Sequence, residues 1–165
     1  MHWILPPYEW VLNNTNGTKH VDSSRASYRG VICDHLGVWC MGFAKFIGVF
    51  SIVEAMLWGV LWGLTLAWLL GFCQVIIEID SEDALRLIRQ SQDWSCYVSI
   101  LDHIYILVNC DRLVKFRHIH QNGNKVADSL TKLVDWTHHS CSTFLSPPVE
   151  VEPLLHEDND VLVTD

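Results

Sequence analysis

The stretch that decides the fold is Val75-Ile76-Ile77-Glu78-Ile79-Asp80-Ser81. Its β-branched residues predict a buried strand, and that strand ends at a carboxylate, Asp80. The stretch overlaps residues 55–77, which carry no charged side chain, and one lone acid, Glu54, precedes them. Two carboxylates placed around a long apolar segment and the strand at its end suggest a metal site, because ligands of open α/β sheets bind at the carboxyl ends of strands.

The rest of the chain predicts an α/β fold around this strand. Further strands are expected at residues 8–15, 28–33, 38–46 and 114–119, the first of them ending at Asn16-Gly17. Residues 18–27 are polar enough to form an exposed connection. Helices are expected at residues 51–70, 82–89, 97–109 and 124–135. The order βββαβααβα predicts a mixed five-stranded sheet with flanking helices, in which the fourth strand runs parallel to the first.

The length and composition indicate one domain with a substantial core. The chain has 165 residues, of which 50% are hydrophobic, and a chain of this size buries about two-thirds of its unfolded surface. We expect an N-terminal extension at residues 1–7, the domain at 8–136, and an acidic, proline-containing tail at 137–165. Because this tail carries much of the net charge of −8, the body offers little nonspecific attraction for phosphate, and a nucleic acid would have to be held by a metal or a partner.

The uncharged segment leaves a membrane span open as an alternative. Residues 55–77 pass a crude length test for such a span, but Gly71-Phe72 interrupts them, and a helix that is apolar on all sides also suits the centre of a compact domain. The first residues lack a basic region and a hydrophobic core typical of a signal peptide. We therefore expect an intracellular chain, in nucleus or cytoplasm, with its six cysteines reduced and packed in apolar segments.

Five side chains are candidates for phosphodiester chemistry. Asn16 and Asp80 follow strands that are expected to be parallel neighbours, so they should meet at one sheet edge. Glu54 and Asp128 each lie about one turn into a predicted helix, and His118 ends the last strand. Crowded carboxylates repel one another unless divalent cations neutralise them, and Mg²⁺ suits such oxygen ligands. Two ions about 4 Å apart can activate water and stabilise the leaving oxygen, while His118 at the rim can move protons.

Each candidate also has a simpler structural interpretation. Asp80 could cap the helix that follows it, Glu54 and Asp128 could be first-turn acids favoured by the helix dipole, and His118 could be a half-exposed strand residue. A zinc site formed by His118-Ile119-His120 with residues 138–141 is a weaker alternative, because adjacent histidines rarely share one ion. The tryptophans at helical spacing, Trp58, Trp62 and Trp68, are expected to be core residues.

These motifs together resemble the ribonuclease H family (type 1), specifically the plant reverse-transcriptase-like domain of non-long-terminal-repeat retrotransposons. The matching segments, in chain order, are Asn14-Thr15-Asn16-Gly17, residues 30–37, residues 54–72, residues 75–81 and residues 118–128. The resemblance spans roughly residues 7–135. It implies a ribonuclease H-like fold and cleavage of the RNA strand of RNA–DNA hybrids by two-metal-ion catalysis, with Mg²⁺ or, alternatively, Mn²⁺ as cofactor.

The resemblance also implies roles for single residues. Glu54, Asp80 and Asp128 match three metal-binding catalytic acids, His118 matches the catalytic histidine, and Asn16 stands where the family has the first catalytic Asp. Further substrate contacts are expected at a group of residues near these positions: Asn14, Thr15, Gly17, Ser81 and Asn124. The partner implied is an RNA–DNA hybrid or another nucleic acid, bound by a monomer or by part of a larger polyprotein.

The departures from the family pattern define two hypotheses. An amide at Asn16 keeps a carbonyl lone pair but loses the charge that bridges two cations, so activity should fall. Arg29 also stands where the family has a small residue before Gly30. The chain is therefore expected to be a weakened hybrid ribonuclease, whose cleavage Asn16→Asp should raise, or else a degenerate domain that binds nucleic acid or protein without cutting.

Overall fold

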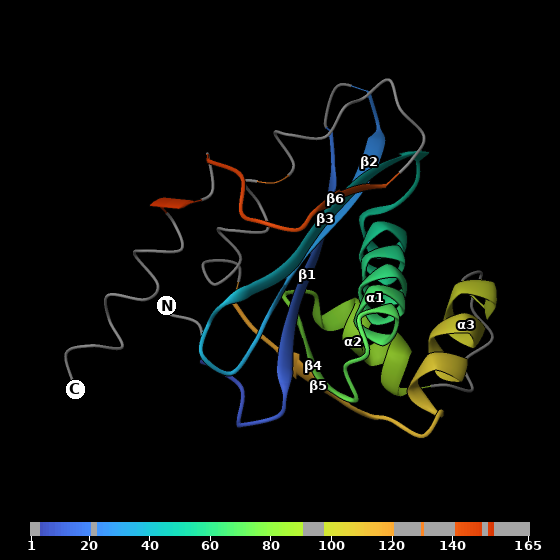
Figure 1. Cartoon of the computed structure of the whole chain (residues 1–165). Coiled ribbons are helices and arrows are strands. Elements are labelled where there is room, and N and C mark those ends of the chain that lie inside the picture. The colour runs from blue at the N-terminus through green and yellow to red at the C-terminus, as the bar shows by residue number, and fades with distance from the viewer. Residues whose placement is uncertain are drawn as a thin grey trace.

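A computed structural model describes residues 4–20, 23–90, 98–120, 130, 141–149 and 152–153 of the chain. The described strands and helices (Figure 1) are, in chain order, β1 (Val11–Lys19), β2 (Arg25–Cys33), β3 (Trp39–Val49), α1 (Ile52–Leu69), β4 (Gln74–Ile79), α2 (Glu82–Arg89), α3 (Val98–Val108), β5 (Leu113–His118) and β6 (Ser142–Phe144). This order confirms the predicted order of strands and helices from β1 to β5. The predicted helix at 124–135 lies outside the described residues, except for Leu130, which is helical.

The strands form one mixed sheet in the order β5-β4-β1-β2-β3-β6. β1, β2 and β3 pair as an antiparallel meander, whereas β4 runs parallel to both β1 and β5. This arrangement confirms the predicted mixed sheet and the parallel pairing of the first and fourth strands. β6 is an additional strand, antiparallel to β3. It lies in the predicted tail, and the domain boundary at residue 136 stays a prediction.

The first hairpin is longer than the sequence pattern indicated. β1 continues through Asn16 and Gly17 to Lys19, and its last residues pair with the start of β2. The predicted end at Asn16-Gly17 and the predicted connection at 18–27 are therefore wrong. Gly17 is needed for contact rather than for a turn, because a Cβ there would lie 2.6 Å from the backbone nitrogen of Met56 in α1.

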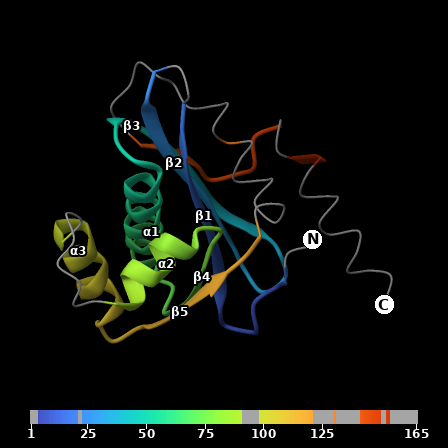
Figure 2. The same ribbon diagram turned by 180° about the vertical axis from the view of Figure 1, so that it is seen from behind.

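Helix α1 is the apolar centre of the fold. Ser51 caps its start, and Gly71 follows its end with a φ of +85°, as the residue types predicted. The helix packs on β1 and β2, and α1, α2 and α3 lie on the same face of the sheet (Figure 2). By length and composition, α1 alone among the described helices could cross a membrane, yet half of its residues are buried inside the fold.

The predictions for the tryptophans and for the cysteines have different outcomes. Trp58, Trp62 and Trp68 are partly buried against the main core, in agreement with the predicted core role. The five described cysteines are free, but only Cys33 is fully buried, while Cys73 and Cys110 are exposed. Cys40 and Cys141 pack against the main core, so the predicted core role holds for these two and Cys33. It is wrong for Cys73 and Cys110, because apolar neighbours in sequence do not place a side chain on a buried face.

Candidate active site

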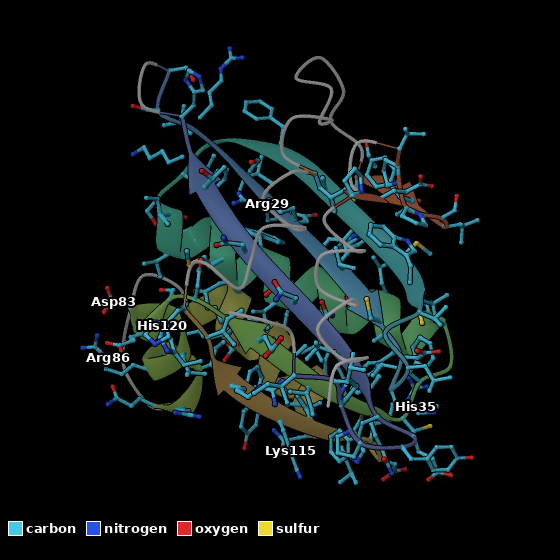
Figure 3. The ribbon with its side chains drawn as sticks, turned by 90° about the vertical axis from the view of Figure 1, so that its left-hand side faces the viewer. Arg29, His35, Asp83, Arg86, Lys115 and His120 are labelled. Atoms are coloured by element: carbon cyan, nitrogen blue, oxygen red, sulfur yellow. The ribbon has the colours of Figure 1, made fainter. Side chains whose placement is uncertain are left out.

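The two faces of β1 carry different residues. An added Cβ at Gly63 of α1 would lie 2.3 Å from the amide of Asn13, and Gly17 also meets α1, so these odd-numbered positions face the helices. Side chains alternate along a strand. Asn14 and Asn16 therefore point to the opposite face, which is the one turned to the viewer in Figure 3.

On that opposite face, three polar residues stand in a row across neighbouring strands. Asn16 of β1 pairs with Arg29 of β2 in the antiparallel register. On its other side, Thr15 pairs with Ile79 in the parallel register, so Asp80 follows at the level of Asn16. Asn16 and Arg29 are only 4% and 5% exposed. The parallel register thus brings Asn16 and Asp80 to the same level of neighbouring strands, and the buried Arg29 lies on the other side of Asn16. The metal-binding roles of Asn16 and Asp80 stay predictions.

The amide of Asn16 has a local role. Its Oδ1 accepts a hydrogen bond from the backbone N–H of Gly17 at 2.8 Å. A carbonyl oxygen has two lone pairs, but one of them is used in this contact. Asn16 therefore offers less to a cation than the carboxylate that the family has at this position.

Glu54 is held in the first turn of α1 by a capping box. The Ser51 hydroxyl accepts from the Glu54 N–H at 3.1 Å, and Oε1 of Glu54 accepts from the Ser51 N–H at 3.2 Å. Because Gly17 lies against Ala55 and Met56, this turn sits beside the end of β1. Glu54 is thus near the predicted site, and one of its oxygens is occupied by the helix cap.

Asp80 does not cap the helix that follows it. The N-cap of α2 is Ser81, whose hydroxyl accepts from the Ala84 N–H at 3.1 Å. The capping interpretation of Asp80 is therefore wrong, and this residue directly follows the end of β4. The predicted substrate contact of Ser81 stays a prediction.

His118 ends β5 next to Ile79 of β4, on the helix-facing side of the sheet. It lines a hollow of about 370 Å³ with residues of α2: Glu82, Leu85, Arg86, Arg89 and Gln90. Its ring lies edge-on to that of His120, with 6.1 Å between centroids. His120 and Arg86 lie at the same edge of the molecule in Figure 3. The hollow therefore combines an imidazole ring with two guanidinium groups and one carboxylate.

A buried ion pair next to the row was not predicted. Oε2 of Glu78 on β4 accepts a hydrogen bond from Nε of Arg117 on β5 at 2.9 Å, and it forms an ion pair with Nη2 at 2.7 Å. Burial raises the pKa of Glu78, and the charge of Arg117 and hydrogen bonds from Arg117 and Asn14 oppose that rise. Asn14 thus supports Glu78 from β1. The contacts of Glu78 with Arg117 and Asn14 could have been predicted from the sequence only by assuming the register of β1, β4 and β5.

Several of the predicted site residues belong to the part of the chain that the structure does not describe. Asp128 and Asn124 lie outside the described residues, as do residues 138–140 of the alternative zinc site. Within the described ranges, no group of three His, Cys, Asp or Glu side chains is suited to a metal ion. Of the expected donors in these ranges, Asn16 and Glu54 each use an oxygen for a backbone N–H, and Arg29 adds positive charge beside Asn16. This set does not fit a centre of two divalent ions.

Residues 14–134 match the family described as "Reverse transcriptase-like". The chain belongs to this ribonuclease H-like family. Within the reverse transcriptase-like family, a curated relative is "Putative ribonuclease H protein At1g65750" of Arabidopsis thaliana, which is 32% identical over 157 residues. The match covers 94% of this chain but 25% of that relative, so the chain spans about a quarter of its length.

Solved structures of ribonuclease H enzymes share the fold. The RNase H1 of Halobacterium salinarum NRC-1 superposes with a TM-score of 0.68 at 17% identity, covering 74% of this chain and 95% of that one. LC11-RNase H1, solved in complex with an RNA/DNA hybrid, gives 0.67 at 19% identity, covering 75% and 95%. The RNase H domain of rv2228c from Mycobacterium tuberculosis gives 0.67 at 18%, covering 74% and 91%. The predicted ribonuclease H-like fold is confirmed.

Proposed function

We propose that this domain binds RNA–DNA hybrids and hydrolyses their RNA strand only weakly. The row formed by Arg29 of β2, Asn16 of β1 and Asp80, directly after β4, carries the proposal. The row keeps one catalytic acid, Asp80, where the family's site is expected. Asn16 lacks the charge of a second acid, and Arg29 adds a charge of the sign that repels a divalent ion.

The hollow beside His118 supports a nucleic-acid substrate. Arg86 and Arg89 line it together with His118, and a guanidinium is suited to two-pronged recognition of phosphate. Arg86 also pairs with Asp83 on the exposed surface of α2. The edge next to the end of β4 thus places two guanidinium groups and the His118 ring where a backbone phosphate could approach, with Glu82 as the acid among them.

Magnesium or manganese is the cofactor that the family implies. When bound, such an ion would supply Lewis-acid activation of the scissile phosphate. The described donors do not fit two of these ions. We therefore propose that the native chain binds the hybrid backbone and orients the phosphate. A hybrid is recognised by backbone shape and 2′-hydroxyls rather than by base edges, so we expect little sequence preference.

Hybrid binding and cleavage test this proposal together. Fluorescence anisotropy with a labelled hybrid should show binding by the native chain, and Arg86→Ala/Arg89→Ala should weaken it several-fold. Gel-based cleavage in Mg²⁺ should be slow for the native chain and absent for Asp80→Asn. The absence of hybrid binding would contradict the proposal and leave the alternative, a degenerate module that binds a protein partner.

A further inference from the structure

A second hollow lies between α1 and β3, on the side of the sheet away from β5 and the hollow at His118. Its volume is about 560 Å³, which is typical of sites for small ligands. The aromatic residues that line it include Tyr28 of β2, Phe50 between β3 and α1, and Trp58 and Trp62 of α1. We call this hollow the aromatic cavity.

The aromatic cavity has a positive charge among its polar groups. Of the described residues that line it, Lys45 is the charged one, and it is half-buried. Lys45 and Tyr28 are partners in the register of β3 and β2, so both lie on the same face of the sheet. Burial raises the pKa of the Cys141 thiol, which also lines the cavity. The charge of Lys45 and the hydrogen-bonding groups of Tyr28 and Trp62 oppose that rise, so these groups gather around the thiol.

The aromatic cavity continues from the candidate active site along α1. Glu54, Trp58 and Trp62 follow one another at steps of four residues, so their side chains lie along one side of the helix. At a rise of about 1.5 Å per residue, Trp62 lies about 12 Å from Glu54 along the helix axis. A polymer that passes Glu54 can therefore place one of its next units in the cavity.

We propose that the aromatic cavity binds an unpaired base of a nucleic-acid strand whose backbone continues to the candidate site at Glu54. Aromatic rings stack on the face of any base, and a basic side chain such as Lys45 holds the adjoining phosphate. Neighbouring bases cover these faces inside a duplex, so the bound base must be single-stranded. The inference deepens the proposed function and rests on it, because it makes a hybrid with a single-stranded extension the preferred substrate.

Fluorescence anisotropy with a set of labelled hybrids tests this preference. The set contains a flush-ended hybrid, the same hybrid with a short single-stranded RNA extension at either end, and matching hybrids whose extension is abasic. One of the extensions should tighten binding to the native chain at least about fivefold, the effect of one stacked base. Its abasic form should add little. Equal affinities for the flush and the extended hybrids would overturn the inference.

Variants of the cavity locate the gain in affinity that the extension causes. Trp58→Leu should lower this gain to that of the abasic extension, and Trp58→Phe, which keeps an aromatic face, should retain most of it. Lys45→Gln should also lower the gain. Lys115→Gln is the matched control and should keep it, because Lys115 is exposed over Trp10 on β5. A full gain in both Trp58→Leu and Lys45→Gln would overturn the inference.

Thiol labelling tests the cavity in the native chain, without any variant that changes its folding. A single-stranded oligonucleotide in the cavity should slow the alkylation of Cys141 by iodoacetamide, measured by mass spectrometry. It should leave the alkylation of Cys73, which is exposed, unchanged. Alkylation of Cys141 at the same rate with and without the oligonucleotide would contradict the inference.

These measurements separate a failure of the inference from a failure of the proposed function. A native chain that binds the flush hybrid but gains nothing from any extension would support the function and refute the role of the cavity. Protection of Cys141 by a single strand, in a chain that does not bind the flush hybrid, would support the cavity and refute the function.

Discussion

Glu78 and Arg117 form a partly buried ion pair between the parallel strands β4 and β5, with 2.7 Å between Oε2 and Nη2. The Glu78 side chain is 4% exposed and that of Arg117 is 33% exposed. Glu78 lies on the same face of the sheet as Asn14 and two residues before Asp80. The ion pair therefore belongs to the polar face that carries the candidate site.

Removing Arg117 should destabilise the fold strongly. Arg117→Ala leaves the buried carboxylate of Glu78 without its cation, which costs about 3 kcal/mol in comparable pairs. Urea denaturation followed by circular dichroism measures this change in the free energy of unfolding. The double variant Glu78→Gln/Arg117→Met serves as the control and should lose clearly less. Equal losses for both variants would show that the pair is not what stabilises this face.

Glu78 should also give the stability a specific pH dependence. Because burial raises the pKa of Glu78 above its ordinary value of 4.5, the native chain binds a proton that the unfolded chain has already released. The contribution of this residue to stability is therefore present near pH 4.5 and is lost as the pH rises through the native pKa. Denaturation of the native chain and of Glu78→Gln at several pH values measures the difference between their free energies of unfolding. This difference should decrease as the pH rises through that range. A difference that rises with pH would contradict the assignment.

The caps of α1 and α2 should be of similar strength. Ser81→Ala removes the acceptor for the Ala84 N–H and should cost about 1 kcal/mol, and Ser51→Ala should cost a similar amount at α1. Thermal or urea unfolding measures both. Unchanged stability in Ser81→Ala would contradict its role as N-cap. A loss of hybrid affinity in this variant, absent from Ser51→Ala, would assign the predicted substrate contact to the Ser81 hydroxyl.

Arg89 should bind the phosphate backbone of a hybrid. Arg89→Ala is expected to weaken hybrid binding and to lower the slope of log affinity against log salt by about 0.9, the value for one phosphate contact on duplex DNA. Arg112→Ala is the matched control, because Arg112 packs over Trp68 away from His118. Anisotropy titrations at several salt concentrations provide the slopes. Identical slopes for the two variants would place the hybrid elsewhere.

Much of the fold could be predicted because its hydrophobic patterns are strong. The β-branched run before Asp80 and the uncharged helix before it required a strand and a buried helix, and their order implied that β4 is parallel to β1. The end of β1 could not be predicted in this way. Asn16-Gly17 has the residues of a tight turn, whereas Gly17 is required by the close approach of α1, which is a tertiary contact.

The relative placement of Asn16 and Asp80 could be predicted, whereas that of Arg29 could not. The parallel pairing of β1 and β4 brings Asn16 and Asp80 to the same level. Arg29 depends on the register between β1 and β2, and a shift of one residue would place its side chain on the other face. The oxygens that Glu54 and Asn16 give to backbone N–H groups likewise depend on local geometry, which no spacing in the sequence reveals.

The rate of RNA cleavage in a labelled RNA–DNA hybrid, in Mg²⁺ and with enzyme in excess, tests the central claim most directly. The native chain should bind the hybrid and cut it at least about 100-fold more slowly than Asn16→Asp/Arg29→Gln, since removing one electrostatic contribution to a transition state costs about this much. Native cleavage as fast as that of the double variant would contradict the account.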